Sequence, residues 1–475
     1  MPMNAPARVR VVMFAAIAAG IAARLAFVAV DDGLFWPDEI YQSLEPAHRL
    51  VFGYGWQAWE FLDGARHWTL PGLAAGLFAL FTAVGLSFPE QTLFATRAFF
   101  CLLSAAVPWA VYRLARSFHA DPMDAALGAV AASLMGLTIY FAPRATGETA
   151  SALPLILGLV WTLDANASHR TRLGGLVLLC AAVFLRLQNA IFCVSLLVIW
   201  LRTRPRQQLI EGLAVFVGAG VVYGLVDFAT WGTFLHSFKA YVGFNLWEGE
   251  STFGREPLWF YVKALLYSEG PVLVPLAVLG AIGWRKAKAL WVSWLAFFLV
   301  HSAVPHKELR FIYVLMPLLA ALGAIGLSAV RERRPGWSLP IRLALVVMTL
   351  VSALQMRQLT FGRLGVRGRI QTISAIDYYG PENRLLMKAG HRDDVCGLRI
   401  LSLQPWRTGG YTYLHKKIPM YGLEQRTGTE SSYNFVIGRG VPPEGTVVAR
   451  DGDAFLLSLG RTQCETDTAY DWHLE

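Results

Sequence analysis

The uninterrupted apolar stretch FIYVLMPLLAALGAIGLSAV, residues 311–330, decides the fold class of this chain of 475 residues. It contains no charged side chain, and it has the length that an α-helix needs to cross the hydrocarbon core of a bilayer, about 20 residues. Similar stretches recur along the chain, so we predict an α-helical polytopic membrane protein with about 11 transmembrane helices. The predicted spans are residues 11–30, 93–112, 123–142, 149–164, 173–186, 188–201, 209–226, 270–284, 289–304, 311–330 and 341–356.

The composition agrees with a membrane protein. Hydrophobic residues make up 55% of the chain and charged residues only 16%, with a mean hydropathy of +0.44. Soluble domains carry about 25% charged residues, so a soluble enzyme, a disordered chain and a coiled coil are excluded. The net charge of +9 is typical of basic cytoplasmic loops, and we expect no nucleic-acid partner.

Residues 72–86, GLAAGLFALFTAVGL, are apolar but short for a membrane span. Because Lys and Arg concentrate in cytoplasmic loops, the basic clusters decide whether this stretch crosses. We predict a cytoplasmic N-terminus, an outside C-terminus, and a helix at 72–86 that lies in the outer leaflet or re-enters from it. A chain with about 12 crossings and a cytoplasmic tail is the alternative. The clusters that fall inside in the preferred topology are Arg113/Arg116, Arg170/Arg172, Arg202/Arg204/Arg206, Arg285/Lys286/Lys288 and Arg331/Arg333/Arg334.

The predicted domain boundary follows residue 358, where polar residues and turn signals replace the apolar stretches. Residues 1–358 form the predicted transmembrane module, with an acidic outer loop at 31–92. Residues 359–475 are predicted to form a small α/β domain outside the membrane, in which Cys396 and Cys464 are the only cysteines. The sequence leaves open whether these two pair. Strand-like stretches in this domain are residues 398–403, 433–437, 446–448 and 454–459.

Asp38 and Glu39 are the candidate catalytic carboxylates. They follow the first predicted span closely, and Pro37 before them is typical of the first turn of a helix. A carboxylate at the membrane surface is suited to removing the proton from an acceptor hydroxyl in a sugar transfer. A purely structural role, in which these acids cap a helix at the interface, explains the pattern about equally well.

The turn PHKELRF, residues 305–311, places three potential cations on the predicted outer face. His306, Lys307 and Arg310 would suit a lipid-linked phosphate, because Arg binds phosphate as a fork and Lys as a point charge. Arg186 is a further candidate, since an arginine between apolar stretches is costly in a membrane. Snorkelling of these side chains towards the headgroups is the alternative. Arg144 and Glu148 follow the third predicted span on the same face.

Three stretches resemble the family 22 glycosyltransferases, the multispanning mannosyltransferases that extend lipid-linked oligosaccharides and GPI anchors. They are PDEIYQSLEPAHRLVFGYGWQAWEF, FNLWEGESTFGREPLWFY and HKELRF. SLQPWRTGGYTYLHKKIPMY is similar to the family's lumenal tail, so the resemblance extends from about residue 35 to 422. The family's His before PDE is Trp36 here.

The resemblance implies a GT-C fold, a polyprenyl-phosphate mannose donor, and an α-mannoside product formed with inversion. It also implies that Asp38 is the general base and that His306, Lys307 and Arg310 bind the donor phosphate. The remaining family positions are implied to contact substrate; they are Gln42, His48, Glu60, Asn245 and Trp259.

Two other functions stay open from the sequence. A GT-C enzyme that transfers another lipid-linked sugar, such as a pentose or glucose, would share these motifs. A lipid or sugar transporter is disfavoured because the chain shows no internal repeat. No DxD motif appears near Asp38, so we expect no cofactor and no bound metal. The expected partners are the bilayer, the lipid-linked donor and a glycan or glycolipid acceptor, in a bacterial inner membrane with the site facing the periplasm, or in the ER membrane of a eukaryote.

Overall fold

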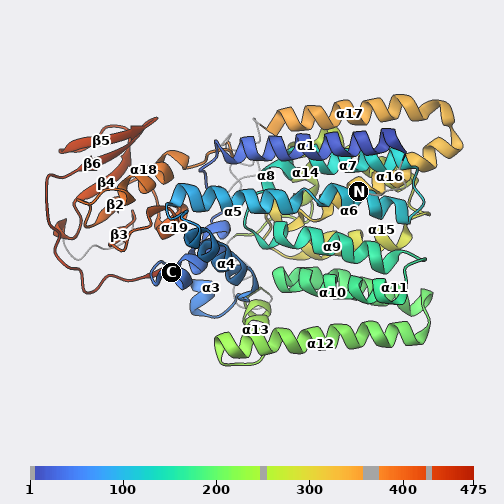
Figure 1. Ribbon diagram of the computed structural model, residues 1–475, viewed down its shortest axis with the longest axis horizontal. Coiled ribbons are helices and arrows are strands. Elements are labelled where there is room, and N and C mark those ends of the chain that lie inside the picture. Colours follow the sequence, from blue (N-terminus) through green and yellow to red (C-terminus); the bar gives the residue numbers. More distant parts are fainter. Residues whose placement is uncertain (1–5, 246–253, 357–373, 424–429, 475) are drawn as a thin grey trace. The chain divides into compact units, whose positions relative to one another are not determined.

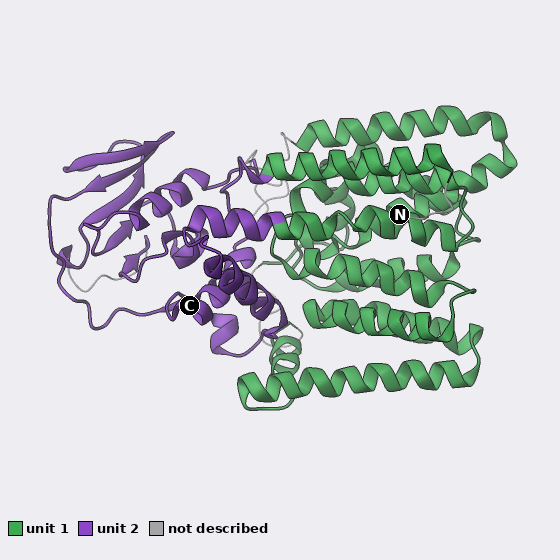
Figure 2. Cartoon of the chain, in the orientation of Figure 1, with its two compact units in different colours: residues 1–27, 99–371 green, residues 28–98, 372–475 purple. Residues whose placement is uncertain are grey.

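The computed structural model describes residues 6–245, 254–356, 374–423 and 430–474. The chain divides into two compact units, which we call unit 1 (residues 1–27 and 99–371) and unit 2 (residues 28–98 and 372–475) (Figure 2). The predicted boundary after residue 358 lies outside the described residues. Residues 28–98, which contain the predicted outer loop 31–92, group with the C-terminal residues and not with the helices of unit 1.

Unit 1 is a bundle of long helices joined by short connections (Figure 1). The helices of unit 1 and those that lead into it are α1 (Ala7–Val28), α5 (Pro89–Ser104), α6 (Val107–Ser117), α7 (Pro122–Leu134), α8 (Gly136–Phe141), α9 (Gly147–Leu163), α10 (His169–Leu185), α11 (Ala190–Thr203), α12 (Arg206–Trp231), α13 (His236–Gly243), α14 (Phe260–Ile282), α15 (Lys288–Ala303), α16 (Leu315–Arg333) and α17 (Ser338–Gln355).

Six helical segments among the described residues are long and apolar enough to cross a membrane. They are Ala7–Val28, Pro89–Ser117, Arg206–Trp231, Phe260–Ile282, Leu315–Arg333 and Pro335–Gln355. The other predicted spans correspond to shorter helices, namely α7 with α8, α9, α10, α11 and α15. Each predicted span therefore coincides with helix, and the number that crosses the bilayer stays a prediction.

Helix α16, which contains most of the stretch 311–330, is the central helix of unit 1. Its side chains from Leu315 to Ala329 are all buried, and it packs on α14, α7 and α6. Helix α12 is the opposite case, since apolar side chains such as Leu213, Val217 and Phe228 are more than half exposed. An apolar helix with such exposed side chains is typical of a surface that faces lipid.

The predicted span 123–142 is broken between α7 and α8. The N–H of Gly136 donates to the hydroxyl of Ser352 at 2.9 Å, and the N–H of Leu137 donates to the carboxylate of Glu269. These side chains from α17 and α14 satisfy the backbone groups that the break leaves without helical partners. The sequence pattern did not predict this break, because its cause lies in residues far along the chain.

Unit 2 contains a five-stranded sheet with strand order β3-β2-β4-β6-β5. β2 (Leu398–Ile400) pairs in parallel with β3 (Met420–Tyr421) and β4 (Phe435–Arg439), whereas β6 (Ala454–Ser458) is antiparallel to β4 and β5 (Thr446–Asp451). Four of these strands were predicted, and β3 was not. With α18 (Gly380–Gly390), they form the small α/β fold expected of the C-terminal residues.

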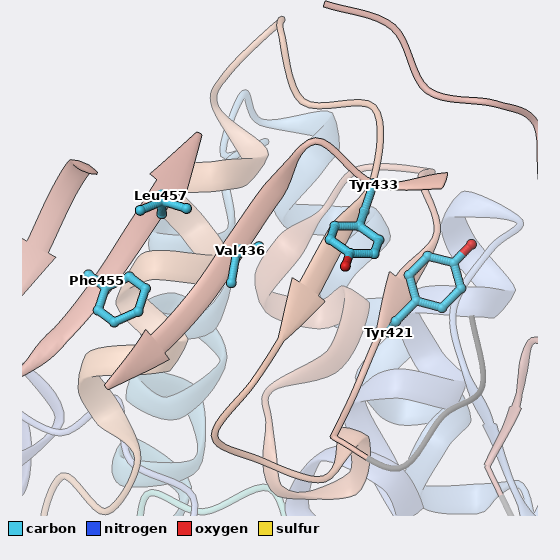
Figure 3. Close-up of a cluster of buried hydrophobic side chains, with 5 residues drawn as sticks. All are labelled: Tyr421, Tyr433, Val436, Phe455 and Leu457. Carbon is cyan, nitrogen blue, oxygen red and sulfur yellow. The ribbon is translucent and has the colours of Figure 1, made fainter. Parts of the chain in front are cut away.

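A cluster of buried side chains packs on this sheet, and it consists of Tyr421, Tyr433, Val436, Phe455 and Leu457 (Figure 3). Cys396 and Cys464, whose pairing the sequence left open, form a disulfide with a Cα–Cα distance of 5.7 Å.

The N-terminal part of unit 2 joins the C-terminal part through backbone pairing. β1 (Gln57–Ala58) is parallel to β7 (His473–Leu474). Its helices are η1 (Ile40–Leu44), α2 (Glu45–Phe52), α3 (Trp59–Leu62) and α4 (Thr69–Ala83), and α19 (Gly410–Leu414) packs on α2 and η1. Helix α4 contains most of the short apolar stretch 72–86, and it belongs to unit 2 and not to the bundle.

Candidate active site

Asp38 lies at the start of a wide helical turn in unit 2. The carbonyl of Pro37 accepts the N–H groups of Ile40 and Tyr41 at 3.0 and 2.9 Å, and the π-helix η1 follows. Such wide turns are rare and occur often at functional sites. The turn brings Gln42 under Asp38, so that the amide of Gln42 donates to the Asp38 carboxylate.

Gln42 also connects Asp38 to a second carboxylate. Its Nε2 donates to Oε1 of Glu60 at 2.9 Å, and a nitrogen of Arg66 lies 3.8 Å from the same oxygen. Burial raises the pKa of Glu60, and the nearby charge of Asp38 adds to the effect, while Arg66 opposes it. The structure thus brings together the predicted residues Asp38, Gln42 and Glu60. Two carboxylates bridged by one amide can hold a proton at one position and leave the other as a base.

Glu39, the other candidate carboxylate, contacts an arginine. Its Oε1 lies 3.5 Å from Nε of Arg97, and both side chains are almost fully buried. Arg97 also donates to the carbonyl of Asp31 at 2.7 Å and to the hydroxyl of Tyr413 at 2.9 Å. This network ties the start of unit 2 to its C-terminal part, which gives Glu39 a structural partner. A catalytic role for Glu39 stays a prediction.

His48, predicted to contact substrate, is buried with 1% of its surface exposed. Its Nδ1 lies 3.0 Å from the carbonyl oxygen of Tyr54 and its Nε2 lies 2.9 Å from Nδ1 of His415. Burial, together with His415, lowers the pKa of His48 to about 3, so the ring is neutral at physiological pH. A ring with both nitrogens engaged inside the protein is suited to holding α2 in place.

In unit 1, Arg310 and Arg186 share one carboxylate. Arg310 lies in the short 3-10 helix Leu309–Ile312, where its Nε donates to Glu308 at 2.5 Å and its Nη1 donates to Oε1 of Glu148 at 3.3 Å. Nη1 of Arg186 lies 2.5 Å from the same oxygen. Phe311 packs against both guanidinium groups. The centroid of its ring lies 5.3 Å from Cζ of Arg186 and 4.8 Å from Cζ of Arg310. The structure therefore brings together two predicted phosphate ligands that are 124 residues apart in sequence.

Arg186 has hydrogen-bonding capacity that the described residues leave unused. It follows the end of α10 with an extended backbone, φ −154°, and its side chain is 6% exposed. Its Nε and Nη2 atoms are buried, and neither has a hydrogen-bond partner in the described part of the chain. Because a buried unpaired N–H group is costly, these two atoms are candidates for hydrogen bonds to the oxygen atoms of a ligand.

Lys307 and His306 lie in the same turn with different neighbours. The ammonium group of Lys307 donates to the carbonyls of Glu256 and Pro305, at 2.8 and 3.4 Å. Nε2 of His306 lies 3.2 Å from Glu308. Although burial by itself raises the pKa of Glu308, Arg310 and His306 outweigh it and lower the pKa to about 2. Glu308 therefore remains charged and holds the side chains of Arg310 and His306 beside it.

The other predicted contacts lie in the connection before α14. Nδ2 of Asn245 donates to the carbonyl of Tyr241 at 2.8 Å, and Trp259 is 65% exposed. Residues 246–253 of the motif lie outside the described residues. The structure does not bring either side chain to the arginine pair through a described contact.

Sequence reasoning noticed Glu148 without giving it a role, and it missed His301. Glu148 lies in the first turn of α9, where Thr146 caps the helix. Nδ1 of His301 lies 2.9 Å from the carbonyl of Phe297, and its buried Nε2 has no hydrogen-bond partner among the described residues. Arg186 and Glu148 lie within electrostatic range of this ring. A charged or polar residue inside an apolar helix is the signal that points to both.

No group of three or more His, Cys, Asp or Glu side chains within the described ranges is arranged to hold a metal ion. The expectation that the protein needs no metal stays a prediction.

Comparisons with known proteins agree with the resemblance seen in the sequence. GPI mannosyltransferase 3 of Yarrowia lipolytica is 26% identical over 84% of this chain and 75% of its own length. GPI alpha-1,2-mannosyltransferase 3 of Homo sapiens is 25% identical, over 82% of this chain and 68% of its own.

Among solved structures, ArnT from Cupriavidus metallidurans bound to undecaprenyl phosphate has a similar fold. The TM-score is 0.63 at 14% sequence identity, and the match covers 94% of this chain and 97% of ArnT. Residues 16–415 match the model of the Alg9-like mannosyltransferase family. The chain therefore belongs to the Alg9-like mannosyltransferase family, and it is a membrane glycosyltransferase with the GT-C fold.

Proposed function

We propose that the protein transfers a mannosyl group from a polyprenyl-phosphate mannose donor to a hydroxyl group of a glycan or glycolipid acceptor. The transfer takes place on the periplasmic or lumenal face of the membrane, with inversion at the anomeric carbon. The proposal is carried by two buried nitrogen atoms of Arg186 that have no hydrogen-bond partner among the described residues. Arg186 shares the carboxylate of Glu148 with Arg310.

The arginine pair suits the leaving group of this reaction. When the anomeric C–O bond breaks, negative charge develops on the lipid phosphate, and cations already in place there lower the barrier. Arg186 offers two N–H groups on one edge of its guanidinium, which matches two phosphate oxygens. The solved ArnT structure of similar fold holds undecaprenyl phosphate, a lipid phosphate of the class we propose here.

Asp38 is the proposed general base. Its carboxylate takes the proton of the acceptor hydroxyl as that oxygen forms the new bond to the anomeric carbon, and the phosphate departs from the opposite face of the ring. Gln42 orients the base through its hydrogen bond. Glu60, whose pKa is raised by burial, accepts the second hydrogen bond of the same amide.

The disulfide supports an outer location for unit 2. Disulfides persist in oxidising compartments such as the periplasm and the ER lumen, and they are rare in the cytosol. Reporter tags inserted at Gln207 and Lys286 should therefore be cytoplasmic, while tags at Phe88 and at the C-terminus should be outside. A cytoplasmic C-terminus would contradict both the proposed face and the topology.

The function is tested by transfer in membranes that carry the protein. Radiolabelled polyprenyl-phosphate mannose should donate mannose, and GDP-mannose without the lipid carrier should not. Arg186→Ala should abolish transfer, whereas the control Arg202→Ala, which changes an exposed arginine in the last turn of α11, should have no effect. Transfer from polyprenyl-phosphate glucose or pentose but not from polyprenyl-phosphate mannose would show that the proposed sugar is wrong. If no donor transferred its label, the proposed enzymatic function would be overturned.

A further inference from the structure

A run of partly buried aromatic rings in unit 2 begins at Phe35, three residues before Asp38. The rings of Phe35 and Trp36 meet edge to face, with centroids 4.6 Å apart, and Phe35 also contacts Tyr378 at 5.5 Å. The rings of Tyr378 and Tyr379 follow at 4.0 Å. The run thus combines two segments that lie more than three hundred residues apart in sequence.

The run continues with polar groups at its far end. Tyr378 donates its hydroxyl to the hydroxyl oxygen of Tyr379 at 2.9 Å, and Arg407 donates to the same oxygen at 3.1 Å. The guanidinium of Arg407 lies 4.6 Å above the ring of Trp406, which is 40% exposed. Because the Tyr379 oxygen already accepts two hydrogen bonds, its own O–H is left to donate to an oxygen outside this run.

The backbone holds these rings in a fixed arrangement. The N–H of Leu34 donates to the carbonyl of Tyr378 at 2.7 Å, and the N–H of Asp377 donates to the Asp31 carboxylate at 2.6 Å. Asp377 and Tyr379 have positive φ values of 54° and 59°, a region that residues with side chains rarely adopt. Such conformations persist where the surroundings impose them, and they are common at binding sites.

We propose that Phe35, Trp36, Tyr378, Tyr379, Trp406 and Arg407 form an acceptor platform, which binds the sugar rings of the acceptor glycan next to Asp38. The proposal rests on the proposed function, because it assigns the acceptor of the same reaction. Sugar rings present C–H groups that stack on the negative faces of aromatic rings. The hydroxyl of Tyr379 and the guanidinium of Arg407 supply hydrogen bonds to the sugar hydroxyls between the rings. This alternation of aromatic faces and polar donors fits a glycan and not a lipid chain.

The platform predicts that a longer acceptor binds better than a short one. The probes are octyl α-mannoside and octyl α-mannotrioside, with saturating polyprenyl-phosphate mannose and initial rates as the readout. The wild type should have the lower KM for the trioside. Trp406→Ala should raise the KM for the trioside about tenfold, as expected for one lost stacking contact, and change the KM for the monomannoside much less. Trp406→Phe should restore most of the preference.

Two further variants separate binding from folding. Tyr379→Phe removes one hydroxyl and keeps the ring, so it should raise the KM for the trioside with little change in kcat. Phe88→Ala is the matched control, since it truncates an exposed aromatic residue of unit 2 outside the platform and should leave both KM values unchanged. Unchanged KM values in Trp406→Ala and Tyr379→Phe would overturn the platform while leaving the enzymatic function intact.

A calorimetric measurement keeps the two proposals distinguishable. If the wild type transfers mannose to neither acceptor, the proposed function fails, and free mannotriose is then titrated into the purified protein. Binding by the wild type that Trp406→Ala weakens would support the platform on its own. No binding by the wild type would overturn it.

Discussion

In unit 1 the buried carboxylate of Glu148 contacts two arginine side chains, whereas in unit 2 the buried carboxylate of Glu45 is held by neutral donors. Glu45 accepts four hydrogen bonds, from the N–H groups of Trp56, Tyr411 and Thr412 and from the Thr412 hydroxyl. In unit 1 a charge is balanced by charges, and we propose that a phosphate binds the Arg186 nitrogen atoms that have no partner among the described residues. In unit 2 the carboxylate fixes the backbone, and no ligand has to displace it.

We expect this difference to separate groups that act on substrate from groups that stabilise the fold. We expect substitutions in the first class to change rates and substitutions in the second class to change stability. We propose that Asp38 and the arginine pair belong to the first class, and we predict from their contacts that Glu39, Glu45 and His48 belong to the second.

The largest expected effect is at Asp38. Asp38→Asn keeps the shape of the side chain but removes its charge and most of its proton affinity, so the transfer rate should fall about 100-fold to 10,000-fold. Glu39→Gln should cost less activity and lower the unfolding midpoint, because it weakens the buried contact with Arg97. The measurement is the initial transfer rate at matched expression, with the unfolding midpoint of each variant. A dead Glu39→Gln beside an active Asp38→Asn would move the base by one residue.

The arginine pair should show the next largest effect. Arg186→Lys and Arg310→Lys keep the charge but lose the planar fork, so kcat/KM for the donor should fall by roughly 2–4 kcal/mol of transition-state stabilisation. If the side chains only reached towards lipid headgroups, both exchanges would be nearly silent. Donor saturation curves for the two variants decide between these outcomes. The control is Arg334→Lys, because Arg334 lies at the end of α16 that is far from the HKELRF turn.

Glu45 tests the second half of the comparison. Glu45→Gln places an amide NH₂ where N–H donors already converge, which leaves buried donors unpaired and should destabilise unit 2 by about 1–3 kcal/mol. Residual activity per folded molecule should stay close to that of the wild type. Thermal unfolding in detergent gives the midpoint, with the exposed Glu444→Gln as control. A stable but inactive Glu45→Gln would place Glu45 with the groups that act on substrate.

The sequence was informative where function depends on local patterns. The HKELRF turn and the loop around Asp38 were found from charges next to apolar stretches, and both contain the contacts described above. The strands β2, β4, β5 and β6 were predicted because alternation and turn residues are local signals.

What the sequence did not predict depends on contacts between distant segments. The pairing of Glu39 with Arg97, of Arg186 with Glu148, and of β1 with β7 joins residues that no periodicity links. The grouping of residues 28–98 with the C-terminal residues follows from the same long-range contacts. Such partners are set by tertiary packing, which a single sequence does not record.

His48 should show the smallest effect at neutral pH, because its contribution to stability changes only when the pH falls. Because the pKa of His48 is about 3 in the folded protein, against an ordinary value near 6.5, the unfolded chain binds a proton below about pH 6.5 that the folded protein does not bind. The folded state therefore loses stability as the pH falls from about 6.5 towards 3, by about 1.4 kcal/mol per pH unit, and gains nothing above this window.

The test for His48 compares slopes and not absolute midpoints. Glu45, whose pKa is raised by burial, opposes the trend, and His415, whose pKa burial lowers, adds to it. Both groups are present in the wild type and in His48→Gln, so the difference between their unfolding midpoints from about pH 7.5 to about pH 4.5 isolates His48. The unfolding midpoint of the wild type should fall more steeply on acidification than that of the variant. Parallel curves would mean that His48 binds a proton in the folded protein as readily as in the unfolded chain. The ring would then have to be accessible, as expected of a residue that contacts substrate.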